Sequence, residues 1–256
     1  MVTERLAGLS ARERLVLALD LEDMVQAREA LVELKNEIGM VKIGLQFCSA
    51  LGLPRAIEFV SVLCPGRGIV VDLKLHDVPK TMARATAAIV RYPQVKLFTM
   101  HASANVEGMQ GVVKRSGATA KALGVTVLTS MTEAQCRRIY GKSPPDKVRE
   151  MVEDMLEAQV PGLVCSPQEL EMLDRDEKFD GLIRMVPGAT PAWAPAKEQA
   201  RPLPPREAMR LGADLLVFGS AILEVPEGIE SRVAAARLIV QEIQLGLEDR
   251  AREVRS

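Results

Sequence analysis

Short apolar segments and amphipathic segments alternate along the whole chain, and this alternation restricts the possible folds more than any other feature. Segments such as EDMVQAREALVELKNEI (22–38) carry apolar residues three and four positions apart, as amphipathic helices do. Strands that alternate with helices predict a parallel sheet. Eight apolar segments in 256 residues favour an α/β fold of the closed (β/α)8 or TIM-barrel type over an open doubly wound sheet. The eight segments are LVLALD (15–20), MVKIG (40–44), GIVVDLKL (68–75), VKLFTMH (95–101), GVTVLTS (124–130), PGLVCS (161–166), LIRMVPG (182–188) and DLLVFGS (214–220).

No linker or low-complexity segment divides the chain, so we expect residues 1–256 to form a single domain. The segment VPGATPAWAPAKEQARPLPP (186–205) holds six of the fifteen prolines and predicts a loop at 188–206 after the seventh strand. Long loops in compact domains are usually lids or binding loops, although a plain surface insertion is the alternative. The pattern VAAARLIVQEIQLGLEDRAREV (233–254) predicts a C-terminal helix.

The composition argues against several classes of protein. The formal net charge is −1 and aromatic residues make up 3%, so neither a basic field nor base-stacking platforms favour nucleic acid as a partner. No apolar run approaches the ~20 residues that span a bilayer, and the N-terminal MVTERLAGLSARER lacks the apolar core of a signal peptide. The glycines form neither a GxGxxG nor a GxxxxGK[ST] pattern, which argues against nicotinamide and P-loop enzymes.

Cysteine and histidine are too few and too scattered for a zinc site. None of the four cysteines, Cys48, Cys64, Cys136 and Cys165, is spaced as CxxC, and the chain has two histidines. We therefore expect no metal, and reduced thiols in a cytoplasmic protein.

Charged residues converge where the first three strands end. In VVDLKLHD (70–77), alternation turns Asp72, Lys74 and His76 toward one face and the intervening apolar residues toward the helices. The same parity turns Asp20 and Lys42 inward from the first two strands, at the barrel end where active sites lie. A structural ion network is one reading of these four charges. The other is a site that destabilises a substrate carboxylate beside an acid and protonates the resulting carbanion from a lysine.

The segment VVDLKLHDVPKT (70–81) resembles the DxKxHDIPxT signature of the orotidine 5′-monophosphate decarboxylase family. Metal-using barrels of the same superfamily keep the DxK pair but generally carry an acid where Lys42 stands, so VKIG (41–44) favours the orotidylate branch. The resemblance covers most of the chain, and the remaining matches follow in order: LALD (17–20), MHAS (100–103), VTVLTSM (125–131), LVCSPQE (163–169), VPGATP (186–191) and GADLLVFGSAI (212–222).

The resemblance implies a homodimeric barrel that converts orotidine 5′-monophosphate to uridine 5′-monophosphate and CO2 in de novo pyrimidine biosynthesis, without metal or cofactor. Lys74 would protonate the pyrimidine carbon that loses CO2, and Asp72 would stress the departing carboxylate. Lys42 would orient Asp72 and touch the ribose. Asp77 and Thr81 would reach into the active site of the neighbouring subunit.

The resemblance also implies a set of substrate-binding residues. Asp20 would bind a ribose hydroxyl, and Ser130, at the end of the fifth strand, would bind the pyrimidine edge. Gln199 would bridge the pyrimidine and the phosphate as the Pro-rich loop closes. The backbone of Gly188 and of Gly219 would approach the phosphate. His76 and His101 are left without a role, because a histidine supporting a strand end is at least as good a reading.

The chain departs from the family after the eighth strand, where the family usually carries a phosphate-binding arginine and this chain has Ser220. A hydroxyl makes a neutral hydrogen bond, whereas arginine makes charged, bidentate ones. Arg201 or Lys197 could substitute from the Pro-rich loop. Three hypotheses follow: a decarboxylase with a rebuilt phosphate grip, a catalytically weak or inactive nucleotide-binding relative, and an enzyme for another phosphorylated substrate.

Overall fold

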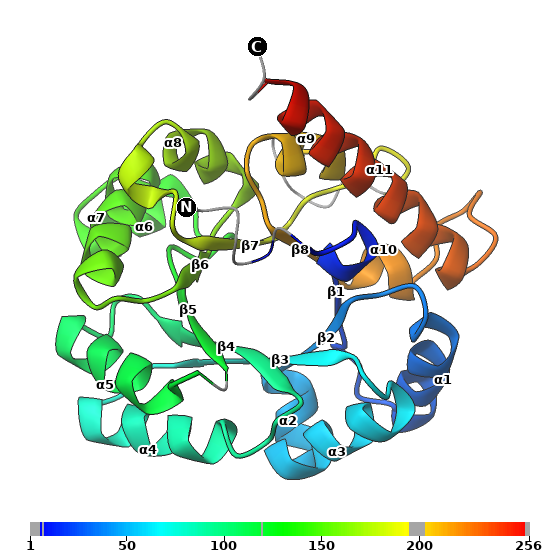
Figure 1. Ribbon diagram of the computed structural model, residues 1–256, viewed down its shortest axis with the longest axis horizontal. Helices are drawn as coiled ribbons and strands as arrows, with labels where there is room; N and C mark the ends of the chain where they lie inside the picture. Colours follow the sequence, from blue (N-terminus) through cyan, green and yellow to red (C-terminus); the bar gives the residue numbers. More distant parts are fainter. Residues whose placement is uncertain (1–5, 7, 119, 195–202, 254–256) are drawn as a thin grey trace.

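The computed structural model describes residues 6, 8–118, 120–194 and 203–253. Eight parallel strands pair in sequence order, and β8 returns to β1, so the sheet closes into a barrel (Figure 1). The (β/α)8 fold predicted from the alternation is confirmed. The strands are β1 (Leu15–Ala18), β2 (Met40–Gly44), β3 (Gly68–Leu75), β4 (Val95–His101), β5 (Lys121–Val125), β6 (Gly162–Val164), β7 (Ile183–Pro187) and β8 (Leu215–Phe218).

Helices form the outer ring around the barrel (Figure 1). The described residues also contain the 3-10 helices η2 (Arg12–Arg14), η3 (Pro167–Glu169) and η4 (Glu177–Phe179). None of the helices within the described residues is long and apolar enough to cross a membrane. The helices are α1 (Met24–Leu34), α2 (Leu45–Leu51), α3 (Leu53–Leu63), α4 (Pro79–Ile89), α5 (Val106–Ser116), α6 (Glu133–Tyr140), α7 (Pro144–Glu157), α8 (Leu170–Asp174), α9 (Pro205–Arg210), α10 (Ser220–Leu223) and α11 (Arg232–Glu253).

Strand alternation divides the apolar residues into two cores. The larger core lies between the strands and the helices and takes residues such as Leu17, Val41 and Val71. The smaller core fills the inside of the barrel with Val16, Ala18, Val70, Leu97, Leu123, Ile183, Met185, Leu215 and Val217. Apolar side chains fill the barrel interior. The polar residues that face inward on the same strands therefore lie at the mouth of the barrel, at the carboxyl ends of the strands.

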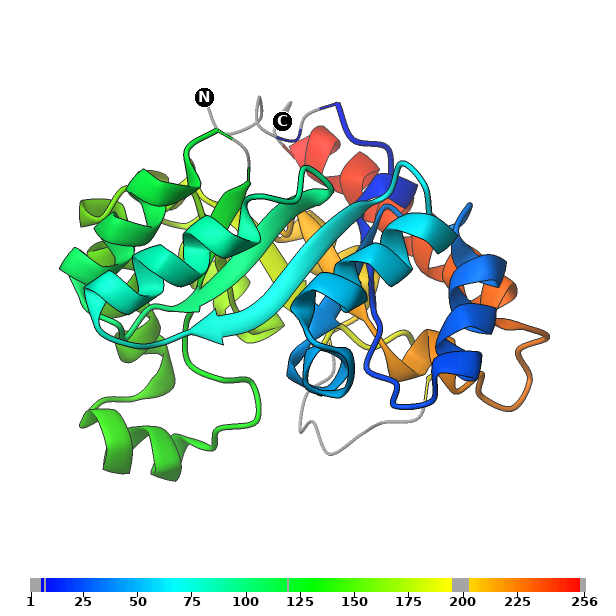
Figure 2. The same ribbon diagram turned by 90° about the horizontal axis from the view of Figure 1, so that it is seen from below.

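The fifth strand differs from its predicted position at 124–130, because β5 covers Lys121–Val125. The apolar pattern continues past the strand since Val127 packs in the outer core although it lies outside the sheet. A backbone hydrogen bond from Met131 to Leu128 then turns the chain. Figure 2 shows α6, in green, projecting from the barrel at the end to which the arrowhead of β3 points.

The C-terminal helix and the Pro-rich segment meet at α9. The predicted C-terminal helix is confirmed as α11, which lies along α9 (Figure 1). The two helices approach closely because Gly246 has no side chain: a Cβ there would lie 2.3 Å from the carbonyl oxygen of Arg206. Residues 195–202 of the Pro-rich loop lie outside the described residues. The packing of α9 on α11 therefore fixes the point where the chain re-enters the barrel before β8.

Candidate active site

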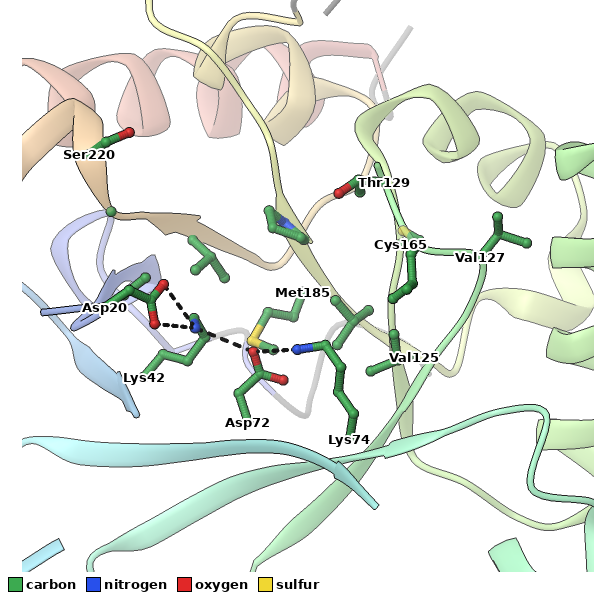
Figure 3. Close-up of a pocket in the computed structure, with 16 residues that line it drawn as sticks. Asp20, Lys42, Asp72, Lys74, Val125, Val127, Thr129, Cys165, Met185 and Ser220 are labelled. Carbon is green, nitrogen blue, oxygen red and sulfur yellow. Dashed lines mark hydrogen bonds and ion pairs between the residues drawn. The ribbon is translucent and has the colours of Figure 1, made fainter. Parts of the chain in front are cut away.

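A cavity of about 390 Å³ opens at the carboxyl ends of the strands. Its size suits a small-molecule ligand. One wall is charged and consists of Asp20, Lys42, Asp72 and Lys74 (Figure 3). The rest of the lining is mainly apolar and also includes Gly219 and Ser220. The apolar wall includes Val125, Val127, Val164, Cys165, Met185 and Val217.

The four charged side chains form one alternating chain of ion pairs (Figure 3). The Lys42 Nζ lies 3.3 Å from Asp20 Oδ1 and 3.3 Å from Asp72 Oδ2. The Lys74 Nζ donates to the same Asp72 Oδ2 at 2.9 Å. Asp72 and Lys42 are buried, whereas Lys74 is partly open to the cavity. The structure thus brings together the four strand-end charges that the sequence pattern predicted.

Asp72 is held in its ionised form by its neighbours. Burial alone raises the pKa of its carboxyl, but Lys42 and Lys74, with hydrogen bonds from Lys74 and Thr99, outweigh burial and leave the pKa below its usual value. Both lysines are therefore paired with a carboxylate that stays charged at neutral pH. The array satisfies the requirement that buried charges be paired.

The sequence pattern missed Thr99 of β4, which is fully buried beside the array. Its hydroxyl donates to Asp72 Oδ1 at 2.9 Å and accepts from the backbone N–H of Lys74 at 2.9 Å. Lys74 has a left-handed backbone with φ of +49°. The parity of VKLFTMH could have revealed Thr99, because it is a polar residue on the inward face of an otherwise apolar strand.

The two histidines meet at the ends of β3 and β4. The Ser103 hydroxyl lies 2.8 Å from His101 Nδ1 and 3.3 Å from His76 Nε2, and the two imidazole rings are 5.4 Å apart. Burial, His76 and Lys74 together lower the pKa of His101 below its usual value. The Ser103 hydroxyl therefore supports both imidazole rings through hydrogen bonds, outside the chain of ion pairs.

The predicted phosphate end of the site lies at β7 and β8. Gly188, Gly219 and Ser220 line a second cavity of about 200 Å³, which shares Gly219 and Ser220 with the first. Gly188 has φ of +90°, a conformation that glycine adopts without strain. Ser220 is the first residue of α10. Gly219 and Ser220 therefore line both cavities, whereas Gly188 lines the second cavity.

Other predicted site residues lie elsewhere. Asp77 and Thr81 are exposed after β3, outside the cavity lining, and Asp77 Oδ1 accepts from the Val78 N–H at 2.6 Å. Ser130 is also exposed; β5 ends at Val125, so the expected place of Ser130 at the end of that strand was wrong, and the neighbouring Thr129 lines the cavity. The expected residues Gln199 and Arg201 lie outside the described residues.

A family model describes most of this chain. Residues 13–235 match the model of the orotidine 5′-phosphate decarboxylase / HUMPS family. The chain belongs to this family. Within the described residues, no group of three or more histidine, cysteine, aspartate or glutamate side chains is arranged to hold a metal ion.

Curated relatives and solved structures agree with this family. The chain is 35% identical to an orotidine 5′-phosphate decarboxylase of Geobacter sulfurreducens, over 92% of this chain and 98% of that protein. It is 34% identical to one of Heliobacterium modesticaldum, over 94% of this chain and 100% of that protein. The crystal structure of an orotidine 5′-phosphate decarboxylase from Lactobacillus acidophilus matches with a TM-score of 0.74 at 23% identity, covering 90% of this chain and 98% of that one, and so supports the fold.

Proposed function

We propose that this protein decarboxylates orotidine 5′-monophosphate to uridine 5′-monophosphate and CO2, as a step of pyrimidine biosynthesis. The observation that carries the proposal is the chain of ion pairs from Asp20 through Lys42 and Asp72 to Lys74 at the barrel mouth. The curated relatives named for this activity support the choice of substrate. The inactive relative and the enzyme for another phosphorylated substrate are less favoured, since the array is complete.

The reaction uses the charges of the array in two steps. A substrate carboxylate held beside the ionised Asp72 is repelled, which raises the energy of the bound substrate relative to the transition state. The carbon–carbon bond breaks, CO2 leaves and the electron pair stays on the pyrimidine carbon. The Lys74 ammonium then donates a proton to that carbon, and the neutral amine regains a proton from water. Lys42 holds the carboxylates of Asp72 and Asp20 in place during both steps.

We assign the remaining predicted residues to the rest of the nucleotide. Asp20 binds a ribose hydroxyl, to which Lys42 is adjacent, and Ser130 reaches the pyrimidine edge from its exposed loop. The backbones of Gly188 and Gly219 and the Ser220 hydroxyl approach the phosphate, which is supported by their common cavity. Gln199 and Arg201 of the Pro-rich loop complete the grip, with Arg201 supplying the positive charge.

A spectrophotometric assay tests the activity. Purified protein is mixed with orotidine 5′-monophosphate, with and without EDTA, and the loss of absorbance is followed. We expect turnover that EDTA leaves unchanged. A folded protein without turnover would contradict the proposal and favour the nucleotide-binding relative. Sensitivity to EDTA would point instead to the metal-using barrels.

We further propose that the protein is a homodimer with shared active sites. Asp77 is exposed on the connection from β3 into α4, Thr81 is exposed in the first turn of α4, and the apolar Val78 between them is 62% exposed. Because Asp77 and Thr81 lie outside the cavity lining of their own subunit, their exposed side chains are available for contact with a second copy of this chain. In that dimer, Asp77 and Thr81 enter the partner's site.

A mixing experiment tests the shared sites. Lys74→Ala and Asp77→Asn should each be inactive as pure dimers. After subunit exchange, a mixed dimer has one site that lacks both changes, so activity should return to about a quarter of the wild-type value. Sedimentation of the wild type checks the dimer itself. A monomer, or a mixture that stays inactive after proven exchange, would contradict the shared site.

We infer a cytoplasmic location for the protein. All four cysteines are buried and free, which is usual in a reducing compartment. Cell fractionation with an antibody against the chain tests this inference, and recovery in an extracellular or membrane fraction would contradict it.

A further inference from the structure

The pairing of β3 with β4 is irregular at the active site. Val71 pairs with Phe98 and Leu75 pairs with Met100, so three residues of β3 stand opposite the single residue Thr99 of β4. Bulges of this kind interrupt the ladder of backbone hydrogen bonds and re-aim side chains, often next to active sites. The three residues in the bulge are Asp72, Leu73 and Lys74.

The bulge leaves the backbone N–H of Lys74 without a carbonyl partner on β4, and the Thr99 hydroxyl takes that place at 2.9 Å. The same oxygen donates its one proton to Asp72 Oδ1 at 2.9 Å. A hydroxyl has a single proton, so accepting from Lys74 and donating to Asp72 fixes its orientation. Thr99 is fully buried, so water does not substitute for either bond.

Lys74 also carries backbone strain that this hydroxyl offsets. Its φ of +49° lies in the left-handed region, which is unfavourable for a residue with a long side chain. Strained residues persist where the surroundings over-determine them, and they cluster at active sites. The bond from the Lys74 N–H to Thr99 helps hold the strained conformation that brings the Lys74 Nζ to Asp72 Oδ2.

We propose that Thr99 is a positioning residue for the decarboxylation, fixing the Asp72 carboxylate and the Lys74 backbone through one hydroxyl. This inference rests on the proposed function. Thr99 reaches Asp72 from the side opposite to the lysines, because it binds Oδ1 whereas Lys42 and Lys74 bind Oδ2. The carboxylate is thereby held on both oxygens, and its rotation away from the substrate is prevented.

The test compares Thr99→Val, which removes the hydroxyl at nearly constant volume, with Thr99→Ser, which keeps it. Thr99→Val should lower kcat about tenfold to a hundredfold, with KM changed less than about threefold, because a hydrogen bond to a charged group is lost in the transition state. The acid limb of the kcat/KM profile should move to higher pH, since Asp72 keeps Lys42 and Lys74 but loses a donor. Thr99→Ser should return kcat to within about threefold of wild type.

Thr86→Val is the matched control. Thr86 is equally buried, but its hydroxyl bonds the carbonyl of Met82 within α4, away from the site. It should leave kcat and the acid limb unchanged, whatever it does to the melting temperature. If Thr99→Val does not fold, Thr99→Ala takes its place in the comparison with Thr99→Ser. A Thr99→Val enzyme with wild-type kcat and acid limb, or a loss that Ser does not restore, would overturn the inference.

Failure of the proposed function is recognised separately, because wild-type turnover is measured first. If the wild type does not act on orotidine 5′-monophosphate, the Asp72 carboxyl is titrated by carbon NMR in the absence of substrate. Thr99→Val should then raise the pKa of Asp72 above its value in the wild type and in Thr99→Ser. An unchanged titration would overturn the positioning role on its own.

Discussion

The two halves of the barrel contribute different chemistry to one cavity. In the half formed by β1 to β4, charged side chains on β2, on β3 and just after β1 line the cavity and form ion pairs of 2.9 to 3.3 Å. The half formed by β5 to β8 presents apolar side chains, followed by glycine and the hydroxyl of Ser220 (Figure 3). A rigid charged wall suits the reacting end of a substrate. An apolar wall that ends in backbone groups suits the part of the substrate that is bound but does not react.

Two buried acids make the same contrast sharper. Asp72 in the first half and Glu169 in the second are each 8% exposed. Asp72 has its pKa lowered, because two lysines and two hydrogen bonds outweigh burial. Burial raises the pKa of Glu169 to about 7, opposed by one hydrogen bond from the Ser166 backbone N–H. Equal burial therefore has opposite consequences, and paired cations decide which acid stays charged.

The largest expected effect comes from breaking the charged half at Lys74. Lys74→Ala removes the proton donor, so kcat should fall by about a thousandfold or more. Binding of the product uridine 5′-monophosphate, measured by calorimetry, should stay within about tenfold, because the rest of the cavity is unchanged.

Lys96→Ala is the matched control for Lys74→Ala. Lys96 lies on the neighbouring strand β4 near its beginning and donates to the carbonyl of Pro93, away from the mouth. It should leave kcat unchanged. Equal losses in both variants would mean that general damage to the barrel, rather than loss of the donor, explains the effect.

Glu169→Gln tests the buried acid of the other half. The pKa of Glu169 is raised from 4.5 to about 7, so the stability due to its protonated form is fully present below about pH 4.5 and lost as the pH rises through 7. Glutamine stays neutral and avoids this loss. Between about pH 4.5 and pH 8, the unfolding free energy of the variant minus that of the wild type should therefore increase by up to about 3 kcal/mol.

Urea unfolding at several pH values measures this gain. Glu171→Gln is the control, because Glu171 lies close to Glu169 in sequence, on α8, but is exposed and pairs with Arg175. Its difference from wild type should not depend on pH in that window. If the difference in unfolding free energy between Glu169→Gln and the wild type stays constant from acid to alkaline pH, then folding does not raise the pKa of Glu169.

Arg201→Ala tests whether the Pro-rich loop supplies the charge that the second half lacks. Loss of a charge-assisted contact to the phosphate should raise KM about tenfold to a hundredfold. Steady-state kinetics with orotidine 5′-monophosphate measure it. Arg55→Ala, on the exposed outer face of α3, is the control and should leave KM unchanged. An unchanged KM in Arg201→Ala would place the phosphate on other groups.

Much of the fold follows from local patterns that do not depend on distant contacts. The eight apolar segments and their order predict the barrel, because alternation with helices leaves few other arrangements. The end of β5 was missed because Val127 is buried by tertiary packing after the strand has ended, so its apolar character does not mark sheet. Apolar periodicity reports burial, and strand bounds depend on hydrogen bonds that periodicity does not record.

The site was predictable where strands carry it. Asp20, Lys42 and Asp72 follow from alternation, and the structure brings them together. Alternation also placed Lys74 beside Asp72, but Lys74 reaches the array through a bulge and a left-handed backbone that regular alternation does not contain. The parity of β4 marks Thr99 as an inward polar residue, but its bonds to Asp72 and Lys74 depend on the bulge in the neighbouring strand. A pattern read along one strand does not contain the register between two strands.

The smallest expected effect comes from adding a charge to the neutral half. Ser220 follows Gly219 at the end where the two cavities join, so Ser220→Arg should bring a guanidinium to the proposed phosphate site. We expect KM to fall by roughly tenfold or less, because Arg201 already supplies one charge and a second adds only part of a charged hydrogen bond. Ser220→Gln, long but neutral, controls for length and should give no such gain. In the Arg201→Ala background the gain should be larger, since the added arginine then replaces a missing charge. If Ser220→Arg improves neither background, the phosphate is not held at Ser220, and the neutral half of the cavity binds the nucleotide without a charge at that point.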